Sequence, residues 1–219
     1  MSALSVRVLA SNQYRRERWR NGLGWTREIA RIALAAPTLE LDADDAWDVR
    51  LSIAEIERDA AFSRFPGIDR ELVLLAGNGL SLDFDDGRSV MLAPPHGRHR
   101  FAGEDAVTSR LTDGRTLDFN LMWRRERCEA TLWHRPLVGP MVIFGEPGSV
   151  WCVHLMAGQA RFGDAARSAM HAGDTAILVA GDARLRQVLE GAGEALLMRV
   201  APLAAGTTDP SGVRSSHAP

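Results

Sequence analysis

The chain has 219 residues, of which 46% are hydrophobic, so it can bury the core of one large or two small soluble domains. All 26 basic residues are arginine, which excludes lysine Schiff-base chemistry and a phosphate-loop lysine. Acidic residues number 28 and the formal net charge is -2, so the charge balance predicts neither a nucleic-acid partner nor binding to an anionic membrane.

The N-terminal residues and the cysteines bear on cellular location. A short apolar run precedes a basic one, the reverse of a signal peptide, and no apolar run approaches the roughly 20 residues of a bilayer span. Cys128 and Cys152 lie far apart and outside any CxxC motif, so neither a zinc knuckle nor a redox pair is expected. We therefore expect a cytoplasmic protein, with a disordered tail over residues 204–219.

Short alternating or apolar runs bounded by Gly, Asp and Pro predict a mostly β chain, with helix at most over Asp59–Phe65 or in short stretches elsewhere. Asp-Gly turns predict a hairpin over residues 80–92 and a second strand pair around residues 112–114. The runs Glu71–Ala76 and Ala176–Ala180 are typical of fully buried strands.

An apolar strand followed by glycine occurs twice, at Leu72–Gly77 and at Val153–Gly158, and His171–Gly181 repeats a Gly-Asp-strand-Gly pattern. Such glycines turn the tight corners of a cupin jelly roll. The sequence therefore predicts an all-β double cupin with two jelly-roll β-barrel or sandwich units, at residues 1–125 and 126–203.

Most cupin enzymes bind a metal through two His, a Glu and a later His, at fixed distances from the glycine that ends the buried strand. Counting from Gly77 gives Ser63, Phe65, Arg70 and Arg100, and counting from Gly158 gives Phe144, Glu146, Trp151 and Arg184. Neither set suits a cation, so no metal or other cofactor is expected. His96 and His99 lack a third ligand at matching spacing and are expected to be exposed loop histidines.

Two alternating segments carry polar residues on one face. Arg50 and Ser52 point the same way in Val49–Ala54, and Asp118 and Asn120 do so in Leu117–Trp123. These faces either meet solvent or line a small-ligand pocket. In a pocket, the guanidinium of Arg50 or Arg70 would bind a carboxylate in a two-pronged manner, whereas a solvent-facing Arg70 would pair with Asp69 or Glu71.

Tryptophan and glycine cluster in Trp19–Thr26, where the two glycines allow a sharp bend. This segment is either a structural hairpin or a cover that brings Trp19 and Asn21 over a pocket mouth. The arginines on either side of it and those near residue 125 are read as solvated strand faces. Neither Ser52 nor Ser63 lies in a GxSxG motif, so a hydrolase triad with His134, His154 or His171 is not predicted, and surface positions are expected for these histidines.

The same segments resemble the HutD/Ves family. The resemblance covers about the first 125 residues and rests on four motifs: Trp19–Ala30, Trp47–Ala54, Phe62–Arg70 and Asp118–Met122. Ala60-Ala61 departs from the Asp-Gly common in the family, which affects the shape of that turn. The resemblance implies a bicupin fold, an association with histidine utilisation, and these pocket residues: Trp19, Asn21, Thr26, Arg50, Ser52, Ser63, Arg70, Asp118 and Asn120.

The leading hypothesis is therefore a metal-free protein that binds a small carboxylate or amino-acid-like intermediate of histidine degradation, such as urocanate or a formyl- or formimino-glutamate, and moderates pathway flux. The alternative is a cofactor-free isomerase or lyase with Asp118 as general base. A neighbouring arginine would lower the pKa of Asp118, which favours the binding role. A protein-interaction module and a homodimer both stay open.

Overall fold

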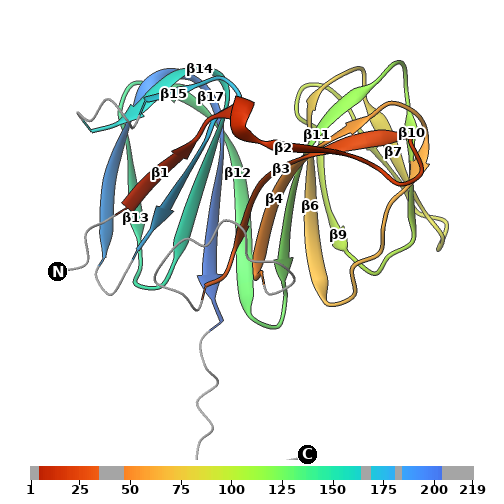
Figure 1. The fold of residues 1–219 in the computed structure, drawn as a ribbon, viewed down its shortest axis with the longest axis horizontal. Coiled ribbons are helices and arrows are strands. Elements are labelled where there is room, and N and C mark those ends of the chain that lie inside the picture. The colour runs from red at the N-terminus through yellow and green to blue at the C-terminus, as the bar shows by residue number, and fades with distance from the viewer. Residues whose placement is uncertain (1–4, 35–46, 164–168, 181–183, 204–219) are drawn as a thin grey trace, which may run out of the picture.

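A computed structural model of the chain describes residues 5–34, 47–163, 169–180 and 184–203 (Figure 1). Within these ranges the chain forms β-strands and one single-turn 3-10 helix, η1 (Ser11–Gln13), so the prediction of an all-β fold is confirmed. No helix in the described part of the chain has the length and apolar character needed to cross a membrane. The tail at 204–219 and the end of the His171–Gly181 pattern lie outside the described residues.

The strands before residue 125 are β1 (Ser5–Leu9), β2 (Arg15–Arg18), β3 (Gly24–Ile32), β4 (Val49–Ile56), β5 (Ala60–Ala61), β6 (Ile68–Ala76), β7 (Leu80–Phe84), β8 (Ser89–Leu92), β9 (Arg98–Ala102), β10 (Val107–Leu111) and β11 (Thr116–Arg124). The later strands are β12 (Cys128–Val138), β13 (Met141–Gly145), β14 (Val150–Phe162), β15 (Ala169–His171), β16 (Thr175–Val179) and β17 (Leu185–Pro202).

The described strands form three antiparallel sheets. A six-stranded sheet has the order β2-β3-β4-β11-β6-β9, and a four-stranded sheet has the order β5-β10-β7-β8. The seven-stranded sheet runs β1-β16-β14-β17-β12, with β13 on β17 and β15 on β14. Figure 1 shows two lobes side by side, and β1 crosses to the lobe of the C-terminal strands, where it pairs with β16. The predicted division at residue 125 stays a prediction, with β1 as an N-terminal contribution to the second lobe.

Strand alternation gives β11 two different faces. Phe119, Leu121 and Trp123 belong to the core between the two lobes, where they join residues of β12, β14 and β17 such as Leu132, Cys152 and Met198. Residues of the opposite face of the six-stranded sheet, including Leu72 and Leu74 of β6, pack with Leu80, Leu82 and Phe84 of the four-stranded sheet. The polar residues of β4 and β11 therefore point into the N-terminal lobe rather than into solvent.

Two local predictions are wrong and one is confirmed. The hairpin over residues 80–92 forms, because β7 pairs with β8. The strands beside Asp113-Gly114 do not pair with each other: β10 pairs with β5 and β7, and β11 pairs with β4 and β6. The turn instead carries the chain from one sheet to the other. Residues 59–65 are not helical, because Ala60 and Ala61 form β5 on the edge of the four-stranded sheet.

Three histidines are also less exposed than expected. His154 is buried in the C-terminal lobe, where its Nδ1 lies 3.0 Å from the Thr175 hydroxyl, and burial lowers its pKa to about 4. His99 lies on β9 and its Nε2 is buried without a partner in the described residues. His96 is half-buried in the loop before β9 and lies 3.1 Å from Glu194. Both cysteine thiols are buried and free.

Candidate functional site

A cavity of about 440 Å³ opens into the N-terminal lobe. Its floor is the inner face of the six-stranded sheet, and its walls come from the β2–β3 hairpin and from the segment after β5. The lining residues are Glu17, Arg18, Trp19, Arg20, Asn21, Thr26, Arg50, Ser52, Ala54, Ala61, Phe62, Ser63, Phe65, Arg70, Leu72 and Asn120. This volume is within the range of small-molecule sites.

Eight of the nine residues predicted from the sequence line this one cavity: Trp19, Asn21, Thr26, Arg50, Ser52, Ser63, Arg70 and Asn120. Register explains the convergence. Asn120 is the cross-strand partner of Ser52 on one side and of Leu72 on the other, and Met122 is likewise flanked by Arg50 and Arg70. The ninth residue, Asp118, is not part of the lining. That these residues bind a ligand stays a prediction.

Arg70 carries the most unusual charge in the cavity. It is only 6% exposed, and no carboxylate in the described residues pairs with its guanidinium. The guanidinium lies 5.1 Å from the ring centre of Phe62, 5.7 Å from that of Phe65 and 5.0 Å from that of Phe101. Burial and the nearby charge of Arg50 lower the pKa of Arg70 to about 9, so the group is still cationic at neutral pH. The surface pairing considered for Arg70 does not form, since Asp69 pairs with other arginines.

Weak contacts hold the Arg70 side chain in place. Its Nε and Nη2 each lie 3.4 Å from Oδ1 of Asn120, and its Nη1 lies 3.5 Å from the carbonyl oxygen of Ser63. These distances are long for hydrogen bonds to a cation, which are usually 2.7–2.9 Å when the acceptor is charged. The guanidinium therefore keeps most of its capacity to bind an anion.

Arg50 differs from Arg70 because its charge is already balanced. Its Nη2 lies 2.6 Å from Oε2 of Glu28, and its Nε lies 3.0 and 3.1 Å from the two carboxylate oxygens. Arg31 contacts the same carboxylate at 3.2 Å. Glu28 was not among the residues predicted from the sequence, although it lies two residues after Thr26 on the same strand. An anion entering the cavity gains more from the unpaired Arg70 than from Arg50.

The β2–β3 hairpin forms the cavity mouth, so it is both the structural hairpin and the pocket cover that were alternatives from its sequence. The Trp19 indole donates a 2.9 Å hydrogen bond to the Thr26 hydroxyl. A side chain at Gly24 would place its Cβ 2.5 Å from the Glu55 carbonyl oxygen and 3.1 Å from the Trp19 ring, so glycine is required there. Asn21 is exposed, and its Oδ1 accepts a hydrogen bond from the Leu23 backbone N–H. Asn21 is therefore a turn-forming residue at the rim of the cavity.

Two polar groups on the floor of the cavity can form further hydrogen bonds. Ser52 is only 2% exposed and lines the cavity, and its hydroxyl makes no hydrogen bond to any described residue. The Asn120 amide accepts from Arg70 through its oxygen, which leaves its NH₂ group available as a donor. Together with Arg70, these groups can fix the orientation of a small polar ligand.

Asp118 lies one cross-strand row deeper than Asn120, between Ala54 and Leu74. Its Oδ2 accepts a 2.6 Å hydrogen bond from the Thr116 hydroxyl, and its Oδ1 is buried without a partner in the described residues. Burial raises the pKa of Asp118 to about 7. The expectation of a pKa lowered by an arginine is therefore wrong, because no arginine among the described residues contacts this carboxyl group.

The residues at the counted cupin metal-ligand positions lie partly in the cavity and partly on the surface. Ser63, Phe65 and Arg70 line the cavity, so a guanidinium and a phenyl ring lie where the count placed ligands. Arg100 instead points outward, 2.7 Å from Asp69. In the second lobe, Phe144 and Trp151 line a separate hollow of about 310 Å³, while Glu146 and Arg184 pair with each other at 3.1 Å. Among the described residues of these sets, no group of metal ligands forms.

The model of the HutD family matches residues 11–197. The chain belongs to the HutD family. Protein Ves of Citrobacter koseri is 35% identical over 147 residues, which are 67% of this chain and 70% of that protein. An uncharacterised 21.2 kDa protein in the hutC 3′ region of Pseudomonas putida is 35% identical over 127 residues, or 58% of this chain and 63% of that protein, so the match spans less than two thirds of this relative.

Solved structures agree with this assignment. The structure of HutD from Pseudomonas fluorescens SBW25 in a formate condition is 26% identical, with a TM-score of 0.75 over 91% of this chain and 100% of that one. The Escherichia coli pirin YhhW is 8% identical with a TM-score of 0.64, which shows a shared fold alone. The resemblance read from the four motifs is thus confirmed.

Proposed function

We propose that this HutD-family protein binds a small carboxylate of histidine degradation in the N-terminal cavity and thereby moderates flux through the pathway. Urocanate and formyl- or formimino-glutamate are the candidate ligands. The observation that carries the proposal is the buried, unpaired guanidinium of Arg70 at the cavity wall. A buried charge is costly unless it is paired, and a carboxylate supplies the missing partner with two-pronged geometry.

The polar groups beside Arg70 give the site its orientation. The Asn120 NH₂ group and the Ser52 hydroxyl are free to contact a second polar group of the ligand, and Phe62 and Phe65 offer an apolar wall. Histidine degradation is supported by the family and by the relative in the hutC 3′ region. A double-cupin architecture and a cytoplasmic location are parts of the same proposal.

A thermal-shift screen of histidine-pathway carboxylates tests the binding role. A ligand at about 100 times its Kd should add about 2.7 kcal/mol to the free energy of unfolding. Matched amides of the same molecules should give no shift, because they cannot pair with a guanidinium as an anion does. Absence of any shift with every carboxylate at millimolar concentration would contradict the proposal.

Trp19→Phe is expected to weaken ligand binding severalfold. The substitution removes the indole N–H, which donates a hydrogen bond to the Thr26 hydroxyl at the cavity mouth. Loss of this hydrogen bond should also cost about 1 kcal/mol of stability. Trp25→Phe is the matched control, because Trp25 also donates through its indole, to Glu57 at 3.2 Å, but does not line the cavity. Isothermal titration should separate the two variants; equal affinities would contradict a role of the hairpin in binding.

The alternative of a cofactor-free enzyme draws on one observation, the raised pKa of Asp118, which is near the value that suits a general base at neutral pH. Against it stands the position of Asp118 outside the cavity lining. Turnover of a pathway intermediate by the protein, lost in Asp118→Asn, would favour the enzyme over the binding protein.

A further inference from the structure

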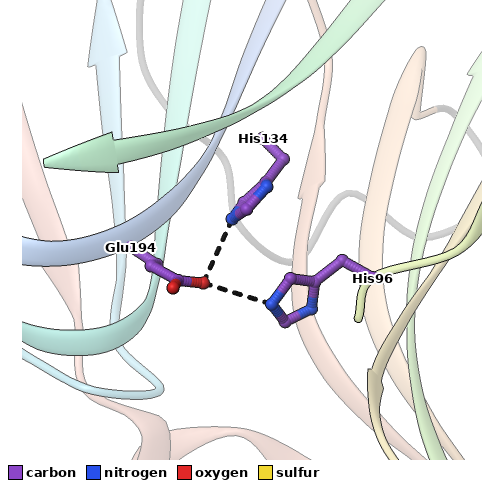
Figure 2. A group of neighbouring side chains, drawn as sticks. All are labelled: His96, His134 and Glu194. Atoms are coloured by element: carbon purple, nitrogen blue, oxygen red, sulfur yellow. Dashed lines mark hydrogen bonds and ion pairs between the residues drawn. The ribbon is translucent and has the colours of Figure 1, made fainter. Parts of the chain in front are cut away.

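His96, His134 and Glu194 meet at the junction of the two lobes (Figure 2). His96 comes from the loop between β8 and β9 of the N-terminal lobe, whereas His134 on β12 and Glu194 on β17 belong to the other lobe. The Nε2 atoms of the two histidines lie 3.1 and 3.2 Å from the same atom, Oε2 of Glu194. All three potential ligand atoms lie within 4.8 Å of one another.

The protonation of His96 makes this cluster unusual. Its Nδ1 lies 3.2 Å from the backbone carbonyl oxygen of Leu74. Because a carbonyl oxygen can only accept, the tautomer that forms this hydrogen bond carries its hydrogen on Nδ1. In a neutral imidazole the Nε2 lone pair then faces a carboxylate oxygen at 3.1 Å. Two acceptors at this distance repel each other unless a cation or an additional proton lies between them. His134 has no such conflict, because its Nε2 can carry the hydrogen and donate to Glu194.

This arrangement is the one that metal-binding histidines adopt, since they commonly donate the other ring N–H to a backbone carbonyl. Two of the three distances between ligand atoms suit a small ion. Zinc bound tetrahedrally at about 2.0–2.1 Å separates its ligand atoms by about 3.3 Å, close to both observed N···O distances. The two Nε2 atoms lie within 4.8 Å of each other, and zinc would draw them to about the same separation of 3.3 Å. His96 is held in place by a left-handed backbone conformation, φ 58°, which is uncommon for a residue other than glycine.

We propose that His96, His134 and Glu194 form a binding site for one divalent zinc ion, separate from the carboxylate cavity. Two imidazole nitrogens and one carboxylate oxygen are a common zinc donor set, with the fourth position left to water. The side chains are 20% to 45% exposed, so the ion can enter from solvent. Because the ligands come from both lobes, the ion ties the β8–β9 loop to β12 and β17.

This site is hard to predict from the sequence, because the ligands are separated by 38 and 60 residues along the chain. His96 was considered as a ligand and rejected for lack of a third ligand at matching spacing. The missing His and Glu come from strands of the other lobe, far from His96 in the sequence.

Zinc binding should be measured on the untagged, metal-stripped protein by competition with a chromogenic chelator and by isothermal titration. We expect one zinc ion per chain, and a Tm that rises with zinc but not with magnesium. His96→Gln and His134→Gln should each weaken zinc binding at least about tenfold, whereas the control His171→Gln, at an exposed position outside the cluster, should not change it.

Cobalt offers a second readout, since bound Co²⁺ should give visible absorption bands of tetrahedral type that Glu194→Gln weakens. Circular dichroism verifies that each variant is folded, so that a loss of binding can be assigned to the ligand. No zinc binding at 100 µM, or binding that the three variants leave unchanged, would overturn the proposal.

Discussion

Arg70→Met is expected to abolish carboxylate binding and, at the same time, to stabilise the free protein. Methionine is unbranched and apolar, although shorter than arginine, and can pack against the rings of Phe62, Phe65 and Phe101. It removes a buried charge that has no carboxylate partner in the described residues, and replacing buried charges by apolar side chains has stabilised other proteins by about 1–4 kcal/mol. The ligand loses two charge-assisted hydrogen bonds, each of about 1.5–3 kcal/mol.

Affinity should therefore fall at least about 100-fold while the midpoint of urea unfolding rises. Isothermal titration and urea denaturation measure the two effects separately. Arg110→Gln is the control, because Arg110 is exposed on the outside of β10 and pairs with Asp83, so it should change neither quantity much. A variant that loses binding but is also less stable would show that Arg70 is structural; unchanged binding would remove Arg70 from the site.

Asp118→Asn is expected to change how stability depends on pH. The folded state holds the Asp118 pKa near 7, above the ordinary value of 3.8, so folding favours the protonated carboxyl group. Its contribution to stability is fully present below about pH 4 and is lost as the pH rises toward 7 and above. The loss is on the order of 4 kcal/mol at alkaline pH, at about 1.4 kcal/mol per pKa unit.

The asparagine variant stays neutral and should avoid this loss. Its free energy of unfolding should exceed that of the unchanged protein at pH 8 and approach it at pH 5, as measured by urea denaturation at both values. Asp113→Asn, at an exposed turn position, should show no such difference. A variant with the same pH dependence as the unchanged protein would mean that Asp118 titrates normally, and it would also remove the support for a general base.

Alternation and turn residues predicted much of the N-terminal lobe. Arg50, Ser52 and Asn120 share an inward face because β4 and β11 alternate regularly and pair in register. The sequence could not decide whether that face meets solvent, since the answer depends on the four-stranded sheet that covers it. The pairing of β10 with β7 was also beyond local reasoning, because an Asp-Gly turn predicts a hairpin whether or not its strands enter the same sheet.

The electrostatics of the cavity were even harder to predict from the sequence. Arg50 and Arg70 look alike in the sequence, and only the position of Glu28 on β3 distinguishes a paired guanidinium from an unpaired one. Asp118 follows the same alternation as Asn120 yet is not part of the cavity lining, although its cross-strand partner Ala54 is. Depth along a strand depends on the covering side chains, which a period-2 pattern does not reveal.

A crystal structure of the protein with a histidine-pathway carboxylate bound tests the central proposal most directly. We predict the carboxylate group within hydrogen-bond distance of the Arg70 guanidinium, with the Asn120 amide or the Ser52 hydroxyl contacting the remainder of the ligand. A ligand bound at another place, or in the cavity with its carboxylate on Arg50 and away from Arg70, would contradict this account.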